Sequence, residues 1–250
     1  MKDAPVTDLL FGINSVESRL LAGNQGVHEL TVREGQLSRR VEALVALAEE
    51  AAIPVVRVTD ADLAQLTSIN HQGVALRVTP MGLLGERQLD RILEANPEGL
   101  LLLILDGVTD PRNFGACLRS AATLGVHAVI VPKDNSAPLN AAAAKTASGG
   151  ASIVPVVQVV NLVRCIEQLQ QRGIWIVGTL LEADQALHQV DLTGNVAIVM
   201  GSEERGMRER TRKTCDFLVN IPMPCADLGF NVSVATGICL YEAVRQRLGT

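Results

Sequence analysis

The sequence predicts an α/β protein with a small N-terminal α/β domain and a larger domain built on a mostly parallel sheet. Strand-like and helix-like segments alternate along the 250 residues, and from about residue 99 onward the strand-like runs become longer and more aliphatic. Residues 79–85 (T-P-M-G-L-L-G) have the proline and glycine content of a linker. We therefore expect a first domain over residues 8–78, a linker over 79–98 and a second domain over 99–250.

The first domain should consist of short strands and helices in turn. The stretch G-I-N-S-V-E-S-R-L-L predicts a first helix with Asn14 or Ser15 at its N-cap. Apolar spacing predicts the elements that follow. These are a strand at 27–32, a helix at 37–50, a strand at 54–58, a helix at 61–66 and a strand at 73–78. So small a unit lies near the lower size limit for a domain that folds alone.

The second domain should contain strands that are covered on both faces. Nearly unbroken aliphatic runs predict such strands at residues 100–105, 126–131, 174–179 and 196–200, and a shorter one at 217–221. Helical patterns lie between or after them, at residues 113–124, 138–148, 161–172 and 232–248. Gly125 and Gly173 follow two of these helices, as is typical of helix C-termini. This alternation favours a parallel sheet.

Composition excludes several classes of protein. The 22 basic and 27 acidic side chains leave a net charge of −5, which excludes a uniformly basic surface but not a local basic patch. Aromatic residues make up only 2% of the chain, too few for a binder that stacks single-stranded bases on aromatic platforms. The longest apolar run, residues 100–105, is far shorter than the roughly 20 residues of a membrane helix. The first residues lack the layout of a signal peptide, and the scattered cysteines fit a reduced compartment, so we expect a cytoplasmic protein.

Cysteine and histidine spacing predicts no metal site. The five cysteines are scattered and never form C-x-x-C, so they indicate neither a disulfide framework nor a zinc motif. We expect them to be reduced and packed as small apolar groups. The four histidines have no ligand spacing, and the usual nucleotide-binding signatures G-x-G-x-x-G and G-x-x-x-x-G-K-[ST] are absent.

Two segments place polar residues directly after predicted strands, where open α/β sheets bind their ligands. In residues 105–121, a turn at Asp110-Pro111 precedes Asn113, which is expected to cap the next helix, and Arg119 follows almost two helical turns later. In residues 197–207, a buried strand ends at Gly201, and Glu203 follows at the sheet edge. The densest basic cluster of the chain comes next: Arg205, Arg208, Arg210, Arg212 and Lys213. Either a solvated helix face or a phosphate contact explains that cluster.

A third segment, residues 219–237, has the same layout. A strand ends at Ile221, a loop follows, and Asn231 opens a helix of small residues. In this order and at these spacings the three segments resemble the motifs of the SpoU (TrmH-like) family of RNA ribose 2′-O-methyltransferases, which belongs to the SPOUT class. The likeness covers residues 100–250. The stretches F-G-I-N-S-V-E-S-R-L-L and I-N-H-Q-G-V-A-L-R-V resemble the ribosomal-protein-like RNA-binding domain that precedes many members.

The resemblance implies a fold, a cofactor and partners. The second domain would be a SPOUT domain with a trefoil knot, in which residues near 196–248 are threaded through a loop. The protein would be a homodimer that binds S-adenosylmethionine in the knot, uses no metal and methylates a guanosine ribose in 23S rRNA of the large ribosomal subunit. Gly201, Ile221 and Phe230 would line the cofactor pocket, largely through backbone atoms. The catalytic or substrate positions of the family would fall on Asn113, Arg119, Glu203 and Asn231.

The resemblance leaves the role of Arg119 and the substrate open. Arg119 would act either as the base that removes the hydroxyl proton or as an electrostatic stabiliser; a guanidinium pKa above about 12 favours the second role. Relatives usually carry Ser where this chain has Gly229, and often Gly where it has Glu204. The alternatives are a tRNA methyltransferase of the same family, a non-catalytic RNA-binding paralogue suggested by Gly229, and an unrelated α/β enzyme of small metabolites.

Overall fold

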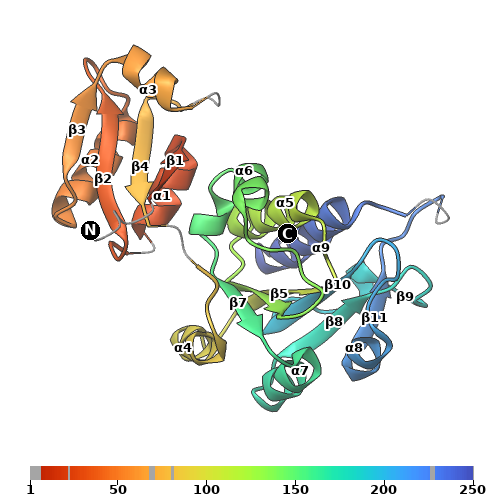
Figure 1. Ribbon diagram of the computed structural model, residues 1–250. Helices are drawn as coiled ribbons and strands as arrows, with labels where there is room; N and C mark the ends of the chain where they lie inside the picture. Colours follow the sequence, from red (N-terminus) through yellow and green to blue (C-terminus); the bar gives the residue numbers. More distant parts are fainter. Residues whose placement is uncertain (1–6, 22, 68–70, 80–81, 226–228, 250) are drawn as a thin grey trace. The chain divides into compact units, whose positions relative to one another are not determined.

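The computed structural model (Figure 1) describes residues 7–21, 23–67, 71–79, 82–225 and 229–249. The chain divides into two compact units, one of residues 1–81 with 151–153 and one of residues 82–150 with 154–250. Within the described part of the chain, no helix is long and apolar enough to cross a membrane.

The first unit is a mixed four-stranded sheet with three helices. Its strands lie in the order β1 (Asp8–Phe11), β4 (Val74–Val78), β2 (Val27–Arg33), β3 (Val55–Val58). The pair β2–β3 is parallel, and β4 runs antiparallel to both β1 and β2. The helices are α1 (Ile13–Leu21), α2 (Arg39–Glu50) and α3 (Asp60–Leu66). Each expected helix and strand of this unit is therefore confirmed, and its ends differ from the expected ones by two residues or fewer. Strand β1 was not predicted.

The first helix begins one residue before the earlier of its two expected caps. Helix α1 begins at Ile13, and the N–H of Val16 bonds to the carbonyl of Gly12, so the expected N-cap at Asn14 or Ser15 is wrong. A side chain from a distant part of the chain explains the difference. The N–H of Ile13 donates to Oε1 of Gln72 at 2.9 Å, which satisfies one of the donors that a capping residue would otherwise take.

The second unit is a seven-stranded sheet whose strand pairs are all parallel. Its order is β7 (Val156–Val159), β6 (Ala128–Pro132), β5 (Leu101–Asp106), β10 (Val196–Gly201), β8 (Trp175–Thr179), β11 (Phe217–Asn220), β9 (Gln185–Ala186). Because the strands are parallel, their carboxyl ends meet at one edge, where β5 and β10 are neighbours and Asp106 pairs with Gly201. The predicted parallel sheet is confirmed, and the knotted threading stays a prediction.

Helices cover both faces of this sheet (Figure 1). On one face lie α5 (Pro111–Thr123), α6 (Ala141–Ala147) and α9 (Val232–Arg247); on the other lie α4 (Glu86–Ala95), α7 (Leu162–Gln171) and α8 (Glu209–Thr214). A short 3₁₀ helix at Leu187–Gln189 completes the unit; a second one, Gly150–Ser152, lies where the chain passes between the two units in sequence. Residues 79–98, expected as a linker, contain α4, whose Leu89 and Leu93 are buried in the core beneath the sheet.

Four of the cysteines behave as apolar core residues. Cys117, Cys165 and Cys239 are buried and Cys215 is half-buried. Burial raises the pKa of the Cys117 thiol to about 11 and the pKa of the other three thiols to about 12. These thiols are therefore protonated at neutral pH and unreactive. The prediction of packed apolar cysteines is confirmed for these four and wrong for Cys225, which is exposed.

Candidate active site

The loop after β5 ends in a helix cap that differs from the expected one. Asp110 caps α5 by accepting hydrogen bonds from the N–H groups of Arg112 (2.6 Å) and Asn113 (3.0 Å). The expectation that Asn113 is the cap is therefore wrong. Pro111 decides the matter, because proline is favoured at the first position of a helix, directly after the cap. Asn113 consequently lies in the first turn of α5, where its side-chain amide is available for other contacts.

The loop after β10 is a tight turn that carries Glu203. Ser202 and Gly206 exchange two backbone hydrogen bonds of 3.1 and 2.9 Å, which close the turn. A Cβ on Gly201 would lie 2.2 Å from the carbonyl carbon of Gly206 and from the nitrogen of Met207. Only glycine fits there, so Gly201 allows the turn to fold back on the strand end. The close approach fixes the position of Glu203 relative to β10.

A buried carboxylate ties this loop to the neighbouring strand. Asp106, fully buried at the end of β5, accepts from Nε of Arg208 at 2.6 Å and from the N–H of Arg208 at 2.9 Å. The Arg208 side chain is about half exposed, so its charge still faces solvent. Sequence reasoning missed Asp106 because its partner is 102 residues away. The contact holds the segment after Glu203 against the sheet edge.

The third loop ends at the N-terminus of α9. Asn231 is the N-cap, as predicted, and its Oδ1 accepts from the N–H of Ser233 at 2.9 Å and from Oγ of Ser233 at 2.6 Å. These two contacts use the oxygen of the Asn231 amide and direct its Nδ2 group towards other partners.

Three of the predicted site residues meet in one hydrogen-bonded cluster. Asn113 donates from Nδ2 to Oε1 of Glu203 at 3.0 Å. Nδ2 of Asn231 donates to the same Oε1 and to Oδ1 of Asn113, the latter at 3.1 Å. The N–H of Val232 also donates to Glu203 Oε1, at 3.2 Å. Residues up to 118 positions apart thus form one polar unit, which we call the Asn113–Glu203–Asn231 cluster.

The cluster leaves one carboxylate oxygen available. Oε1 of Glu203 accepts three hydrogen bonds, whereas Oε2 accepts none from the residues that the structure describes. The position of the carboxylate at the N-terminus of α9 stabilises its negative charge. Oε2 can therefore accept a hydrogen bond from a ligand hydroxyl or amine that is brought to a prearranged position.

A cavity of about 810 Å³ opens beside the cluster. Its size is within the usual range of ligand pockets, about 300–1,000 Å³. Asn113 and Glu203 line it, together with the basic side chains of Arg205, Arg208 and Arg212. These three guanidinium groups suit an RNA phosphate. Glu204 lines the same cavity, so the departure from the family pattern adds a carboxylate there.

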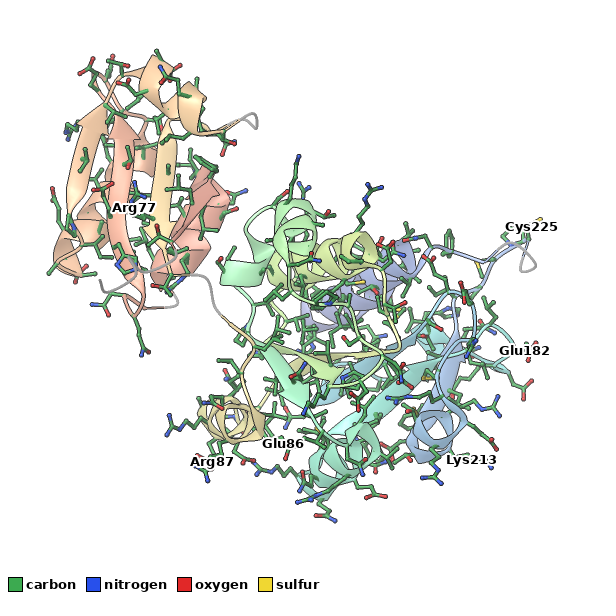
Figure 2. The ribbon with its side chains drawn as sticks, viewed as in Figure 1. Arg77, Glu86, Arg87, Glu182, Lys213 and Cys225 are labelled. Carbon is green, nitrogen blue, oxygen red and sulfur yellow. The ribbon has the colours of Figure 1, made fainter. Side chains whose placement is uncertain are left out.

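The basic cluster that follows Glu203 in the sequence therefore has two kinds of member. Three of its arginines line the cavity, whereas Lys213 extends from the surface of α8 (Figure 2) and pairs with Glu209 one helical turn away, at 2.7 Å. An exposed pair of this kind contributes little to stability. Lys213 thus lies on a solvated helix face, and for the three arginines the phosphate contact stays a prediction.

Arg119 lies outside the cluster. Its side chain is on the exposed part of α5, and among the described residues its guanidinium has one hydrogen-bond contact, from Nη1 to Oγ of Ser148 at 3.5 Å. It does not line the cavity beside Glu203. Within a single chain, the structure does not bring this predicted residue to the three others.

The predicted cofactor residues lie at or after the carboxyl ends of β10 and β11: Gly201 is the last residue of β10, and Ile221 and Phe230 belong to the segment between β11 and α9. Ile221 follows β11 and is half-buried, while the side chain of Phe230 is 44% exposed. Leu181, after β8, is 58% exposed, and a Cβ on Gly229 would lie 3.7 Å from it. These residues leave apolar side chains uncovered beside strand ends, which suits the flat ring of a nucleoside.

Comparisons with known proteins identify the family. The sequence profile of the SpoU rRNA Methylase family matches residues 100–241, and that of the RNA 2′-O ribose methyltransferase substrate-binding domain matches residues 9–82. The chain belongs to the SpoU rRNA methylase family. It is accordingly an RNA 2′-O-ribose methyltransferase, and the alternative of an unrelated metabolite enzyme is wrong.

Relatives of this SpoU methyltransferase are similar over nearly their whole length. The 23S rRNA (guanosine-2′-O-)-methyltransferase RlmB of Pseudomonas putida is 47% identical over 95% of this chain and 96% of its own. RlmB of Vibrio vulnificus is 48% identical over 97% of this chain and 98% of its own. The crystal structure of the SpoU methyltransferase AviRb from Streptomyces viridochromogenes, in complex with AdoMet, matches with a TM-score of 0.66 at 25% identity over 98% of this chain and 92% of its own.

Proposed function

We propose that the protein transfers the methyl group of S-adenosylmethionine to the 2′-hydroxyl of a guanosine in 23S rRNA. The single observation that carries the chemistry is the Asn113–Glu203–Asn231 cluster, because it gathers the polar residues of three distant segments beside one cavity. The choice of substrate is supported by relatives of 46–48% identity that are named for it. An rRNA substrate also supports the expected cytoplasmic location.

The cluster residues would position the reacting ribose. Glu203 Oε2 accepts the hydrogen bond of a ribose hydroxyl, while Asn113 and Asn231 hold the carboxylate in one orientation. Holding two reactants in line accounts for a large part of catalysis in a displacement of this kind. The arginines that line the cavity, Arg205, Arg208 and Arg212, bind the RNA backbone.

Backbone groups at Gly201, Ile221 and Phe230 would hold the cofactor, with the exposed side chains of Leu181 and Phe230 against its adenosine. The bound cofactor supplies a methyl group made electrophilic by its sulfonium. Arg119 lies outside the cluster of its own chain, so in this proposal it reaches the ribose of the other chain's site in the proposed dimer. There its positive charge would stabilise the alkoxide as the hydroxyl proton leaves through a phosphate or water. A permanently charged guanidinium suits that role better than the role of a base.

Gly229 does not count against activity in this proposal. Its φ is +60°, in the left-handed region that favours glycine, so the loop adopts a conformation that a serine would resist. The cluster itself is complete in the presence of Gly229. This supports an active enzyme over a non-catalytic paralogue.

We also propose that two chains associate through α9. Val234 and Tyr241 are 50% and 60% exposed, and Leu248, which ends the helix, is 72% exposed. They lie at intervals of seven residues on one side of the helix, apart from the buried Val232 and Leu240. So regular an apolar stripe is typical of an interface. Analytical ultracentrifugation should show a dimer at micromolar concentration, and Tyr241→Glu should yield a monomer; a monomeric wild type would contradict the proposal.

Methylation of purified RNA tests the function directly. The protein is incubated with S-adenosylmethionine labelled in its methyl group and with 23S rRNA or bulk tRNA that lacks ribose methylation. We expect label in 23S rRNA at one guanosine, and loss of that label in the Asn231→Ala variant. Label confined to tRNA would support the alternative substrate, and no label in either RNA would contradict the proposal.

A further inference from the structure

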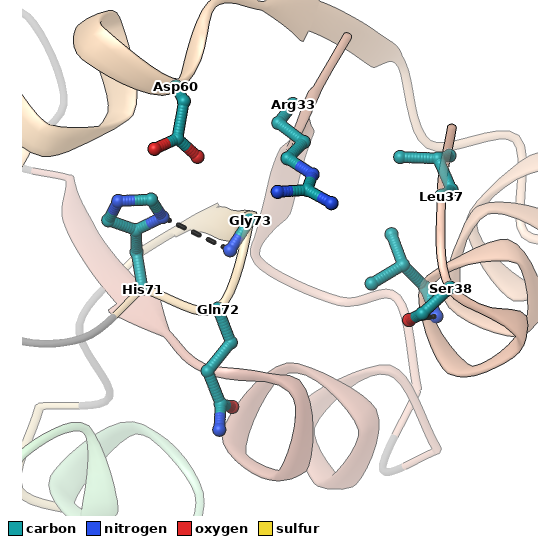
Figure 3. A pocket seen from close by; sticks show the side chains of 8 residues that line it. Arg33, Leu37, Ser38, Asp60, His71, Gln72 and Gly73 are labelled. Carbon is teal, nitrogen blue, oxygen red and sulfur yellow. Dashed lines mark hydrogen bonds between the residues drawn. The ribbon is translucent and has the colours of Figure 1, made fainter. Parts of the chain in front are cut away.

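The first unit contains a polar cavity where the ends of three strands meet. Strands β2 and β3 are parallel, so Arg33, the last residue of β2, and Asp60, just after β3, lie at the same edge of the sheet. The turn of residues 71–74 leads into β4, the antiparallel neighbour of β2, and brings His71 to this edge. Together they surround a cavity of about 370 Å³ (Figure 3).

The turn beside the cavity is held in an unusual conformation. Gln72 and Gly73 have φ values of +51° and +79°, and the N–H of Val74 closes the turn on the carbonyl of His71. A left-handed glutamine is strained, and its side-chain contact with Ile13 holds it in place. A Cβ on Gly73 would lie 3.2 Å from Cδ of Arg33, so the glycine makes room for the arginine stem. The turn therefore determines where Arg33 and His71 lie.

The hydrogen-bonding groups of the cavity are opposite in kind. Nδ1 of His71 accepts from the N–H of Gly73 at 3.1 Å, so the neutral ring carries its proton on Nε2 and is a donor there. No hydrogen bond or ion pair of the Arg33 guanidinium or of the Asp60 carboxylate is found among the described residues. Figure 3 shows both charged ends directed into the same space. The cavity thus offers hydrogen-bond donors, from Arg33 and His71, and an acceptor, the carboxylate of Asp60.

We infer that this cavity binds an unstacked guanine base of the RNA substrate, separate from the nucleotide that is methylated. A phosphate would be repelled by Asp60, whereas guanine has acceptors at O6 and N7 and donors at N1 and N2. Arginine contacts to O6 and N7 and carboxylate contacts to N1 and N2 match those two edges. Bases in single-stranded loops are commonly bound this way, with an imidazole or guanidinium plane against the ring. His71 or Arg33 supplies such a plane.

The inference takes from the proposed function only that RNA is the ligand, and binding can be measured without methyl transfer. The probe is a fluorescent single-stranded oligouridine with one central guanosine, bound to the full-length protein and followed by anisotropy. The comparison oligomers carry inosine, which lacks the N2 amine, or 7-deazaguanosine, which lacks N7. We expect each to bind about five- to tenfold more weakly than guanosine.

Variants assign each preference to one side chain. Asp60→Asn should remove the preference for guanosine over inosine, and Arg33→Gln the preference over 7-deazaguanosine. As controls, Glu50→Gln removes one negative charge and Arg57→Gln one positive charge at exposed positions of the same unit. Both variants should leave the two preferences unchanged. Asn231→Ala should also leave them unchanged, because it alters only the site of methylation.

Three results would overturn the inference. The first is equal binding of all three oligomers by the wild type. The second is a guanosine preference that survives both Asp60→Asn and Arg33→Gln. The third is uniformly tighter binding by Asp60→Asn, which would indicate a phosphate in the cavity. Because Asp60 and Arg33 are exposed, the variants are expected to fold, and their circular dichroism and melting temperatures would confirm it.

Discussion

In the second unit, Asn113, Glu203 and Asn231 bond to one another beside their cavity. In the first unit, Arg33 and Asp60 face a shared cavity, and no such bond links them among the described residues. Because the cluster is already hydrogen-bonded, it holds Oε2 of Glu203 in place before the substrate arrives, which favours the chemical step. Polar groups that are not yet bonded gain their contacts only with the ligand, which favours recognition. Substitutions in the second unit should therefore lower kcat, and substitutions in the first should raise KM for RNA.

The largest effect is expected at Arg119. Replacing Arg119 by Ala should lower the single-turnover rate of methyl transfer about 100- to 1,000-fold, or about 3–4 kcal/mol, because one charge that stabilises the transition state is lost. Affinity for S-adenosylmethionine, measured by calorimetry, should hardly change. Arg119→Lys should restore little, since an ammonium does not reproduce the planar guanidinium. A variant that keeps most of the rate would show that Arg119 is only a surface residue of α5.

The next effect is expected at the buried anchor of the Glu203 loop. Asp106→Asn should lower the free energy of unfolding by about 2–3 kcal/mol, because the bond between the buried carboxylate and Arg208 loses its charge. Asp90→Asn is the matched control, since Asp90 pairs with Arg172 on the surface and should change stability by less than about 1 kcal/mol. Urea denaturation measures both. Equal losses would mean that Asp106 does not anchor the loop.

The smallest effects are expected at two glycines with positive φ, one in each unit. Gly73→Ala and Gly229→Ser should each cost about 1–2 kcal/mol of stability, because both substitutions place a Cβ in the left-handed region. Their functional effects should differ. Gly73→Ala presses on Arg33 and should raise KM for RNA without lowering kcat, whereas Gly229→Ser lies next to Phe230 and should weaken cofactor binding. If both variants changed the same kinetic constant, the two units would not have separate roles.

Much of the fold could be predicted because its strands are long aliphatic runs and its helices have clear apolar spacing. Helix α4 and strand β7 are among the elements that the sequence did not predict. Helix α4 directly follows the glycine and proline residues of 79–85 that indicated a linker, although Leu89, Ile92 and Leu93 have helical spacing. Strand β7 has only four residues, Val156–Val159, next to Pro155, and its length gave no clear pattern.

The candidate site was predictable as a set of loops but not as a set of contacts. Asn113, Glu203 and Asn231 each follow a strand end, so a parallel sheet brings their loops to one edge. Their hydrogen bonds, and the bond between Asp106 and Arg208, join residues that are distant in sequence. The choice between Asp110 and Asn113 as cap could have been made from Pro111 alone.

The claim that the Asn113–Glu203–Asn231 cluster acts as one unit is tested most directly by a double-mutant cycle. The single-turnover rate of methyl transfer to 23S rRNA is measured for Asn113→Ala, Glu203→Ala and the double variant. If the residues act together, each single substitution disrupts the unit, and the double variant should be within about threefold of the slower single variant. A double variant whose loss equals the product of the two single losses would contradict the account.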